Sequence, residues 1–344
     1  MADPKQPIGP EGAKARVVVA GATGYAGALA AQLVWNHPEM ELAEITSRSE
    51  TGVALNRLYP RYDVPLELKE LDLAGLEDVD VGIVAYPHGA AAPVVAEMRG
   101  LGMVVIDLSA DFRLEDLPTY EKYYGPHSEP DLLDGAVYGL PELNRDAVRD
   151  AELIANPGCY PTATILALAP LAEAGLIDDV VIDAKSGVSG AGRGKGESTS
   201  FITITENVSP YKTVGHRHRP EILEQLNGLA PGDIPSLTFV PHLVPVDQGE
   251  LVSCYVRSSV DLVQEDLDKL YSARYLNEPF VKVTDSAPGM RDVRDTNQCH
   301  IQAVAGDDRI LVFAAIDNLW KGSSGQAIQN LNLILGLDEG LGLR

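Results

Sequence analysis

Runs of consecutive apolar residues recur through the first half of the chain and predict the strands of a buried parallel sheet. Strands of such a sheet are covered on both faces, so apolar and polar side chains need not alternate along them. The predicted strands cover residues 15–20, 41–46, 79–86, 103–108 and 153–155. Helical segments stand between them, at residues 28–34 and from residue 87 to about residue 99. This order predicts an α/β domain.

The second half of the chain has a different pattern. Strands are predicted at residues 180–185 and 310–317, and a last helix at residues 327–335. Four further segments alternate in part, and we interpret them as an antiparallel sheet with a covering helix at residues 261–276. These segments are residues 237–240, 249–257, 281–283 and 298–304. Residues 120–144 are rich in Tyr, Pro and Gly, show no clean period and are predicted to be irregular.

The first strand leads directly into a glycine-rich turn, Gly21 to Gly27, and then into a helix. Glycines let the backbone approach a pyrophosphate, which rests on the N-terminus of the following helix. The spacing is GxxGxxG rather than the usual GxGxxG, so the order of strand, turn and helix carries the prediction. A dinucleotide site is therefore expected here, with an ordinary tight turn as the alternative.

The second strand ends in Ser47-Arg48-Ser49. An enzyme that uses NAD usually has an acidic residue at this point, which binds the ribose 2′-hydroxyl. An arginine between two hydroxyls suits a 2′-phosphate instead, so NADP is favoured over NAD. The alternative is an exposed polar loop without a ligand.

Cys159 lies where the short strand at residues 153–155 is followed by a turn, Asn156-Pro157-Gly158, and then by an apolar helix. Pro161 is expected to be the first helical residue. Unpaired N–H groups and the positive end of the helix dipole favour a thiolate at such a place and lower the thiol pKa. Cys159 is therefore a candidate nucleophile, with a small buried hydrophobic residue as the alternative.

Other loops carry polar side chains where parallel sheets bind ligands, at the carboxyl ends of the strands. His88 and Arg113 follow the third and fourth predicted strands. The glycine-rich loop at residues 186–196 carries cations and exposes backbone N–H groups, so it could cradle an anion or be a flexible surface loop. The glycine–serine turn that precedes the last helix is a further candidate contact for an anion or a cofactor.

The segment His216-Arg217-His218-Arg219-Pro220-Glu221 places two histidines two residues apart. In an extended segment both would share one face, and Pro220 would mark the start of a helix at residues 221–226. No third ligand stands at metal spacing, so a cysteine partner or an anion contact is expected rather than zinc. Two surface histidines without a role are the alternative.

Composition narrows the possible partners. The 344 residues include 27 Lys and Arg against 50 Asp and Glu, and the resulting net charge of −23 disfavours nucleic acid and anionic membranes. No apolar run reaches membrane-spanning length, and the polar start of the chain lacks the apolar core of a signal peptide, so we expect a cytoplasmic protein. The other cysteines, Cys254 and Cys299, lie in predicted strands and are expected to be structural.

Taken together, these motifs resemble the N-acetyl-γ-glutamyl-phosphate reductases, which belong to the aspartate-semialdehyde-dehydrogenase-like group. The resemblance covers nearly the whole chain and rests on GATGYAG, PHG, DLSADFR, NPGCYPTA, SGVSGAGR, HRHRPE and NLWKGSSGQAIQN, in this order. NPGCYPT with HRHxPE is the most specific pair. Ser323 and Ser324 stand where the family more often has alanines.

The resemblance implies a Rossmann dinucleotide-binding domain at residues 1–158 and an α/β substrate domain with a mixed sheet at residues 159–317. It also implies that the C-terminal segment, residues 318–344, returns to pack on the first domain. The expected partners are a small-molecule acyl phosphate and further copies of the chain, in a homodimer or a homotetramer.

The resemblance further implies a reaction cycle. The Cys159 thiolate attacks the acyl phosphate, phosphate leaves and a thioester forms; NADPH then delivers hydride, and the thiohemiacetal collapses to the semialdehyde. One of His216 and His218 acts as general acid/base with a pKa close to the working pH, and His216 is preferred. Arg113, Arg193 and Arg217 are placed around phosphate or carboxylate because of their charge.

Apart from the catalytic residues, the motif positions are divided into two predicted sets, one for the cofactor and one for the substrate. The set assigned to NADP is Gly21, Thr23, Gly24, Tyr25, Ala26, Gly27, Ser47, Arg48, Ser49, Pro87, His88, Ser189, Gly190, Asn318, Lys321 and Gly322. The set assigned to the substrate is Ser109, Arg113, Asn156, Ser186, Arg193, Arg217 and Glu221.

Two other functions compete with this one. The nearer is the lysine-pathway homologue, which reduces an aminoadipyl phosphate on a small acidic carrier protein. A chain with a net charge of −23 is a poor electrostatic match for an acidic carrier. The other is an NADP-binding sensor without activity, and the presence of Cys159 and the histidine pair disfavours it, because a sensor needs no nucleophile.

Overall fold

The computed structural model describes residues 14–194 and 196–344, which fall into two compact units. The first unit contains the described residues up to Pro157 together with Ser324–Leu343. The second unit contains Gly158–Ser323 together with Arg344. Among the described residues, no helix is long and apolar enough to cross a membrane.

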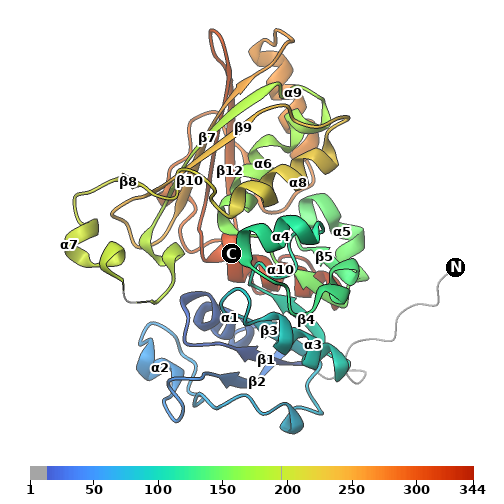
Figure 1. The fold of residues 1–344 in the computed structure, drawn as a ribbon, viewed down its shortest axis with the longest axis vertical. Coiled ribbons are helices and arrows are strands. Elements are labelled where there is room, and N and C mark those ends of the chain that lie inside the picture. Colours follow the sequence, from blue (N-terminus) through green and yellow to red (C-terminus); the bar gives the residue numbers. More distant parts are fainter. Residues whose placement is uncertain (1–13, 195) are drawn as a thin grey trace, which may run out of the picture. The chain divides into compact units, whose positions relative to one another are not determined.

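The first unit is built on a parallel sheet of six strands in the order β2-β1-β3-β4-β6-β5, which confirms the predicted parallel sheet (Figure 1). Its strands are β1 (Ala15–Ala20), β2 (Met40–Thr46), β3 (Val81–Val84), β4 (Val104–Asp107), β5 (Ala136–Tyr138) and β6 (Leu153–Ala155). Its helices are α1 (Tyr25–Trp35), α2 (Leu55–Leu58), α3 (Ala92–Gly100), α4 (Leu117–Tyr124), α5 (Pro141–Arg149) and α10 (Gly325–Ile334).

The prediction that residues 120–144 are irregular was wrong. The segment contains the end of α4, all of β5 and the start of α5, and β5 pairs in parallel with β6 at the edge of the sheet. The hydrophobic period is weak because β5 has only three residues and because Tyr120 is the single buried residue of α4. Tertiary packing, rather than a local pattern, forms these elements.

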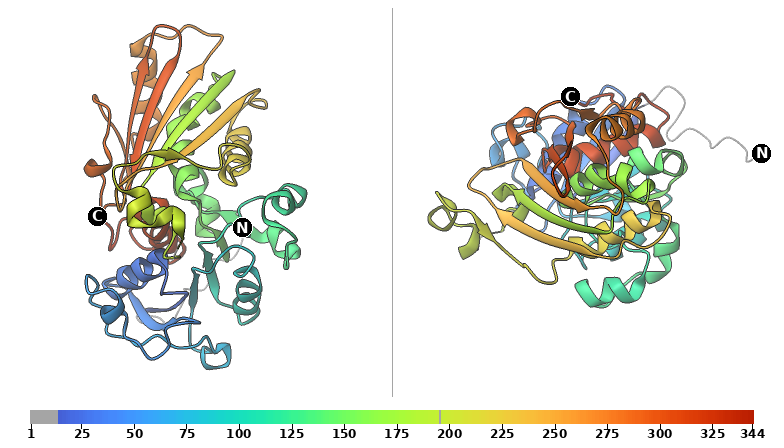
Figure 2. Two further views of the ribbon diagram at one scale, coloured as in Figure 1. Left: turned by 60° about the vertical axis from the view of Figure 1, so that its left-hand side comes forward. Right: turned by 90° about the horizontal axis from the view of Figure 1, so that it is seen from above.

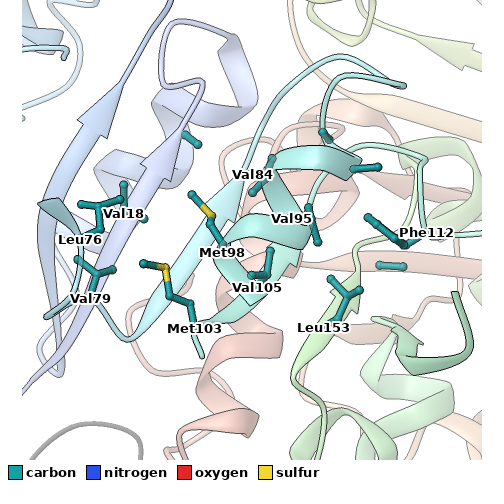
Figure 3. Close-up of a cluster of buried hydrophobic side chains, with 14 of the residues drawn as sticks. Val18, Leu76, Val79, Val84, Val95, Met98, Met103, Val105, Phe112 and Leu153 are labelled. Carbon is teal, nitrogen blue, oxygen red and sulfur yellow. The ribbon is translucent and has the colours of Figure 1, made fainter. Parts of the chain in front are cut away.

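One hydrophobic cluster of the first unit lies between α3 and the sheet (Figure 3). Val95 and Met98 of α3 lie among side chains from neighbouring strands, such as Val84 and Val105. Gly82 in β3 permits this close approach, because a Cβ atom there would lie 2.5 Å from the Met98 sulfur. The cluster fixes the strands whose carboxyl ends carry the candidate ligand contacts.

The C-terminal helix α10 packs on α1 and α5, as the resemblance implied. The Ser324 hydroxyl donates a hydrogen bond of 2.7 Å to the carbonyl oxygen of Ala26 in α1. The Asn330 amide donates to the Gly139 carbonyl oxygen at 2.9 Å. Ser324, which departs from the alanine of the family motif, therefore has a structural role at the start of this helix.

The second unit is built on a mixed sheet of seven strands in the order β11-β12-β13-β10-β7-β9-β8. Its strands are β7 (Asp179–Ser186), β8 (Ser209–Pro210), β9 (Leu237–Leu243), β10 (Glu250–Arg257), β11 (Val281–Val283), β12 (Cys299–Ala305) and β13 (Ile310–Ile316). Its helices are α6 (Cys159–Glu173), α7 (Phe201–Ile204), α8 (His218–Leu229) and α9 (Gln264–Tyr275), and residues Trp320–Ser324 form one turn of π-helix.

The purely antiparallel interpretation of this sheet was wrong, whereas the mixed sheet implied by the resemblance is confirmed. β7 pairs in parallel with β9, and β11 with β12, while the other pairs are antiparallel. Alternation along a strand reports which face is buried and not the direction of its neighbour. Helices α6, α8 and α9 lie on one face of the sheet, and α9 is the predicted covering helix (Figures 1 and 2).

Candidate active site

Cys159 is the first residue of α6, so the predicted strand–turn–helix setting is confirmed for this side chain. The residue before it, Gly158, has extended backbone angles, and no side chain caps the helix. The helix therefore begins two residues before Pro161, which lies within the first turn, where its missing N–H costs nothing. Cys159 is half-buried and stands at the positive end of a 15-residue helix.

The turn before Cys159 is held by Glu221. The side chain of Glu221 lies in the first turn of α8, is 1% exposed, and accepts a hydrogen bond of 2.9 Å from the backbone N–H of Gly158. On the other side, the Thr162 hydroxyl donates to the Gly158 carbonyl oxygen at 2.9 Å. These contacts make Glu221 a positioning residue for the nucleophile, while its predicted substrate contact stays a prediction.

The two histidines of HRHRPE do not lie in an extended segment, so that prediction was wrong. Helix α8 begins at His218, and Arg217 before it already has helical backbone angles. The prediction failed because proline is tolerated throughout the first turn of a helix, so Pro220 need not be the first helical residue. The imidazoles are nevertheless neighbours, with ring centres 5.0 Å apart, because residues at the turn into a helix fold back on one another.

His216 lies in a cluster of aromatic rings. The rings of Tyr160, Tyr211 and Phe239 have their centres 5.2–6.1 Å from that of His216. Burial, together with the charges of Lys212 and Arg217, lowers the pKa of His216 to about 4. The expectation of a pKa close to the working pH is therefore wrong for His216, which is neutral at neutral pH.

The tautomer of His216 follows from its one hydrogen bond to the backbone. Its Nδ1 atom accepts from the N–H of His218 at 3.1 Å. A neutral imidazole that accepts at Nδ1 carries its proton at Nε2. His216 therefore presents an Nε2–H donor rather than an imidazolium.

Two cations accompany this cluster. Arg217 stands at the start of α8, and Lys212 is close enough that Arg217 and burial lower the lysine pKa. Lys212 also has a φ angle of 42°, which L-residues rarely adopt. A lysine held in this conformation beside an arginine can bind an anion, so Lys212 joins the predicted Arg217 as a candidate contact for phosphate or carboxylate.

Several other predicted residues of the second unit meet at the ends of β7, β10 and β13. Asn318 accepts from the N–H of Gly249 at 2.7 Å and donates to the Ser189 hydroxyl at 3.0 Å. The Ser186 hydroxyl is buried and lies beside Gly190, where a Cβ atom would come within 2.8 Å of it. The structure thus brings Ser186, Ser189, Gly190 and Asn318 together.

Gly322 lies against the nucleophile itself. A Cβ atom at Gly322 would lie 2.8 Å from the Cβ of Cys159, so only glycine fits this position. Its neighbour Lys321 is fully buried, with its ammonium 5.7 Å from the centre of the Phe280 ring, which does not favour the predicted cofactor contact. Arg193 is exposed in the loop after β7, where the structure leaves its predicted role untested.

The glycine-rich turn of the first unit, predicted to bind a dinucleotide, lies beside the ends of three strands. Gly21 has a φ of 90°, and a Cβ atom there would lie 2.7 Å from the Ala85 carbonyl oxygen. The N–H groups of Gly21 and Ala22 both donate to the Thr46 carbonyl oxygen, directly before Ser47. The guanidinium of Arg48 lies 4.8 Å from the centre of the Tyr86 ring, which follows β3.

The remaining residues of this turn also suit a dinucleotide. Gly24 is the cap of α1 and leaves its N-terminus without a side-chain hydrogen bond, so Thr23, Tyr25 and Ala26 line an open helix end. A Cβ atom at Gly27 would lie 2.4 Å from the Gly21 carbonyl oxygen. The Ser47 hydroxyl accepts from the N–H of Ser49, which shapes the loop. These features fit the pyrophosphate of a dinucleotide.

Predicted residues after β3 and β4 hold the loops that follow these strands, and Arg113 also binds the loop after β6. His88 follows Pro87 in the loop after β3, and its Nδ1 atom accepts a hydrogen bond from the N–H of Ala110 at 2.9 Å. The Ser109 hydroxyl donates to Asp107 at 2.6 Å, and burial raises the pKa of Asp107 to about 7. Arg113 donates to the carbonyl oxygens of Leu108 and of Asn156. These hydrogen bonds give Arg113 a role in holding the loops, and its predicted ligand contact stays a prediction.

Sequence reasoning missed four residues of this site. Tyr160, Tyr211 and Glu250 interact with Cys159, and Lys212 interacts with His216. Tyr160 stands inside the NPGCYPTA motif, and Tyr211-Lys212 precedes HRHRPE, so proximity to a motif was an available signal. Nothing local distinguishes Glu250, because its position depends on the pairing of β10. Cys254 and Cys299 are buried strand residues, as expected, and the described residues contain no group of three potential metal ligands.

Comparison with known proteins places this chain in a family. Residues 16–151 match the model of the semialdehyde dehydrogenase NAD binding domain, and residues 159–318 match that of the semialdehyde dehydrogenase dimerisation domain. Among solved structures, aspartate semialdehyde dehydrogenase II from Vibrio cholerae covers 94% of this chain and 99% of its own, with a TM-score of 0.72 and 17% identity. The Candida albicans enzyme, solved with NADP, covers 96% of this chain and 100% of its own, with a TM-score of 0.71 and 16% identity. These structures share the fold.

Curated relatives are closer in sequence. The N-acetyl-gamma-glutamyl-phosphate reductase of Desulforudis audaxviator is 49% identical over 340 residues, which cover 95% of this chain and 97% of that protein. The reductase of the same name from Ectopseudomonas mendocina is 48% identical over 338 residues, with the same coverage of both chains. The chain therefore belongs to the N-acetyl-gamma-glutamyl-phosphate reductase family.

Proposed function

We propose that this chain reduces N-acetyl-γ-glutamyl phosphate with NADPH, giving N-acetylglutamate semialdehyde and phosphate, as a step of arginine biosynthesis. Family membership along almost the whole chain supports the substrate. The observation that carries the chemistry is the thiol of Cys159 at the N-terminus of α6, because acyl transfer from a phosphate requires a nucleophile.

The first half of the reaction is acyl transfer to Cys159. The sulfur attacks the acyl carbon, the carbon–oxygen bond to phosphate breaks, and a thioester remains on the enzyme. The free N–H groups and the dipole at the start of α6 stabilise negative charge on the sulfur. Arg217 and Lys212 provide positive charge for the anionic substrate, together with the predicted contacts Arg113 and Arg193.

Reduced NADPH, when bound, supplies hydride to the thioester carbon. The oxygen of that carbon then carries negative charge until the carbon–sulfur bond breaks and the semialdehyde leaves. A histidine of the pair interacts with this oxygen, and His216 is preferred because its neutral ring presents an Nε2–H donor. His218, 5.0 Å away between ring centres, is the alternative.

The loops after β1, β2 and β3 bind the dinucleotide. Gly21 and Gly27 let the pyrophosphate reach the N-terminus of α1, and Ser47, Arg48 and Ser49 face the 2′-phosphate. The description of the matched NAD binding domain supports a nicotinamide dinucleotide, and the arginine after β2 supports NADP.

Replacing Arg48 by Ala is expected to weaken NADPH binding about tenfold or more while leaving NADH binding nearly unchanged. The reason is that only NADPH carries the 2′-phosphate, and a lost charge-assisted contact amounts to about 1.5–3 kcal/mol. Fluorescence titration with both cofactors measures the two affinities. Equal losses for both would show that Arg48 does not recognise the phosphate. Arg61 lies on the first unit and also stacks on a tyrosine, so Arg61→Ala is a matched control.

The chain is further proposed to act as a homodimer or homotetramer, which the description of the matched dimerisation domain supports. It is proposed to be cytoplasmic, since the proposed catalysis needs Cys159 as a reduced thiol.

A further inference from the structure

A buried carboxyl group lies beside the nucleophile. Glu250 is the first residue of β10, opposite Ser186 of β7 on one side and Ile316 of β13 on the other. Its side chain is 0% exposed, and neither carboxyl oxygen accepts a hydrogen bond from an N–H or O–H group of the described residues. A buried carboxyl without such donors carries a large desolvation penalty and is rarely kept in a core without a function.

Among the side chains that act on this carboxyl, Cys159 is the one that lowers the pKa of Glu250, as a hydrogen-bond partner does. Packing around Gly322 places Cys159 near the strand that pairs with Glu250. A Cβ atom at Gly322 would lie 2.8 Å from the Cβ of Cys159 and 3.2 Å from the Cδ1 of Ile316. Ile316 of β13 pairs with Glu250 of β10 in the antiparallel register. Cys159 therefore lies near the end of this pair of strands, where Glu250 stands.

The other titratable groups around Glu250 are acidic or neutral. They are Tyr160 on α6, Asp317 after β13 and Tyr211 after β8. The nearest cation in the register of β7 is Lys185, which pairs opposite Leu251 and binds Asp183 instead. The charge that shifts the pKa of this carboxyl is that of Asp317, which raises it, and a carboxylate and a thiolate at this place also repel each other when both are ionised.

We propose that Glu250 and Cys159 form a dyad that carries a single negative charge, and that the Glu250 carboxylate takes the proton of the thiol when the sulfur attacks the substrate. The dyad deepens the proposed acyl transfer and rests on it for its catalytic role. In this proposal Glu250 exchanges a proton with the reacting sulfur and is in this sense a further catalytic residue.

The proton and electron balance is complete without any further reactant. As Cys159 attacks, its S–H bond breaks, an O–H bond forms on Glu250, and the sulfur electron pair makes the bond to the acyl carbon. Phosphate leaves with the electron pair of the broken carbon–oxygen bond and takes its proton from solvent. After hydride transfer, the carbon–sulfur bond breaks, sulfur keeps that electron pair, and Glu250 returns its proton to the sulfur.

The electrostatics of the site support this exchange. Burial raises the pKa of Glu250 to about 8, and the hydrogen bond from Cys159 acts in the opposite direction. An ordinary carboxyl group has a pKa far below that of a thiol. Because burial raises the pKa of Glu250 and the start of α6 lowers that of the thiol, the two values approach each other and proton transfer between the groups costs less. Two such groups titrate as a pair, in two successive steps.

The test is the pH dependence of iodoacetamide labelling at Cys159, measured without substrate or cofactor from about pH 5.5 to 10. The wild-type labelling rate is expected to rise in two steps, because the dyad loses its two protons successively. Glu250→Gln keeps the shape of the side chain but cannot ionise. The labelling rate of Cys159 in this variant is therefore expected to rise with pH in one step. The same variant is expected to release phosphate about a hundredfold more slowly in a single turnover.

Glu142→Gln is the matched control, because Glu142 is a buried glutamate of the first unit and should leave the two-step profile unchanged. A single-step profile in the wild type overturns the dyad, even if Glu250→Gln fails to fold. Matching profiles in the wild type and a folded Glu250→Gln overturn it as well. Because labelling needs no substrate, a two-step profile in a protein that does not reduce the acyl phosphate upholds the dyad and rejects only the proposed function.

Discussion

Cys159→Ser is expected to lower kcat by several orders of magnitude while NADP binding stays intact. A serine hydroxyl has almost no anionic fraction at neutral pH, so the start of α6 has no thiolate to stabilise and no thioester forms. The cofactor loops lie after β1, β2 and β3 and belong to the first unit, whereas Cys159 belongs to the second. Steady-state turnover and a fluorescence titration with NADPH measure the two quantities separately.

Cys254→Ser is the control for this substitution. Cys254 is 1% exposed in β10 and burial raises its thiol pKa, so it cannot replace the nucleophile. We expect this variant to keep its turnover when folded. If Cys159→Ser kept more than about a tenth of the wild-type kcat, the assignment of the nucleophile would be wrong.

The second large effect is expected at the histidine pair. His216→Asn should lower kcat strongly, because it removes the Nε2–H donor that faces the developing charge on the substrate oxygen. The pKa of His216 is lowered to about 4, so its ring is neutral above that pH and gains a proton below it. Protonation at Nδ1 breaks the hydrogen bond from the N–H of His218 that orients the ring. The wild-type kcat/KM should therefore fall as the pH drops through about 4, and this acid limb should be missing in His216→Asn.

His218→Asn is the matched comparison and should mainly raise KM, through the loss of a positioning or anion contact. Kinetics of both variants from about pH 4 to pH 9 separate the roles. An acid limb that survives in His216→Asn and disappears in His218→Asn would reverse the assignment.

Residues whose environment is set by their neighbours in the chain could be predicted from the sequence. Cys159 is an example, because the strand before it and the apolar helix after it are both continuous in sequence and determine its place at a helix N-terminus. Gly21 and Arg48 are further examples, since each follows a strand of the parallel sheet directly. Local pattern is a sufficient guide where strand, turn and helix follow one another.

Features that depend on distant contacts could not be predicted in this way. Glu250 meets Cys159 only because β10 pairs with β13, at a sequence separation that no local pattern reports. The pKa of His216 depends on burial among Tyr160, Tyr211 and Phe239, which come from three separate segments. The three-residue strand β5 likewise exists because β6 is available for pairing.

Phosphate-dependent oxidation of N-acetylglutamate semialdehyde with NADP tests the central claim most directly. In this reverse reaction, Cys159 attacks the aldehyde and phosphate releases the acyl group from the thioester. The purified protein is assayed side by side with this free semialdehyde and with aminoadipate semialdehyde on its acidic carrier protein. We predict NADPH formation that requires phosphate with the free substrate and none above background with the carrier-linked one. Activity with the carrier-linked substrate alone, or none with either, would contradict the proposed function.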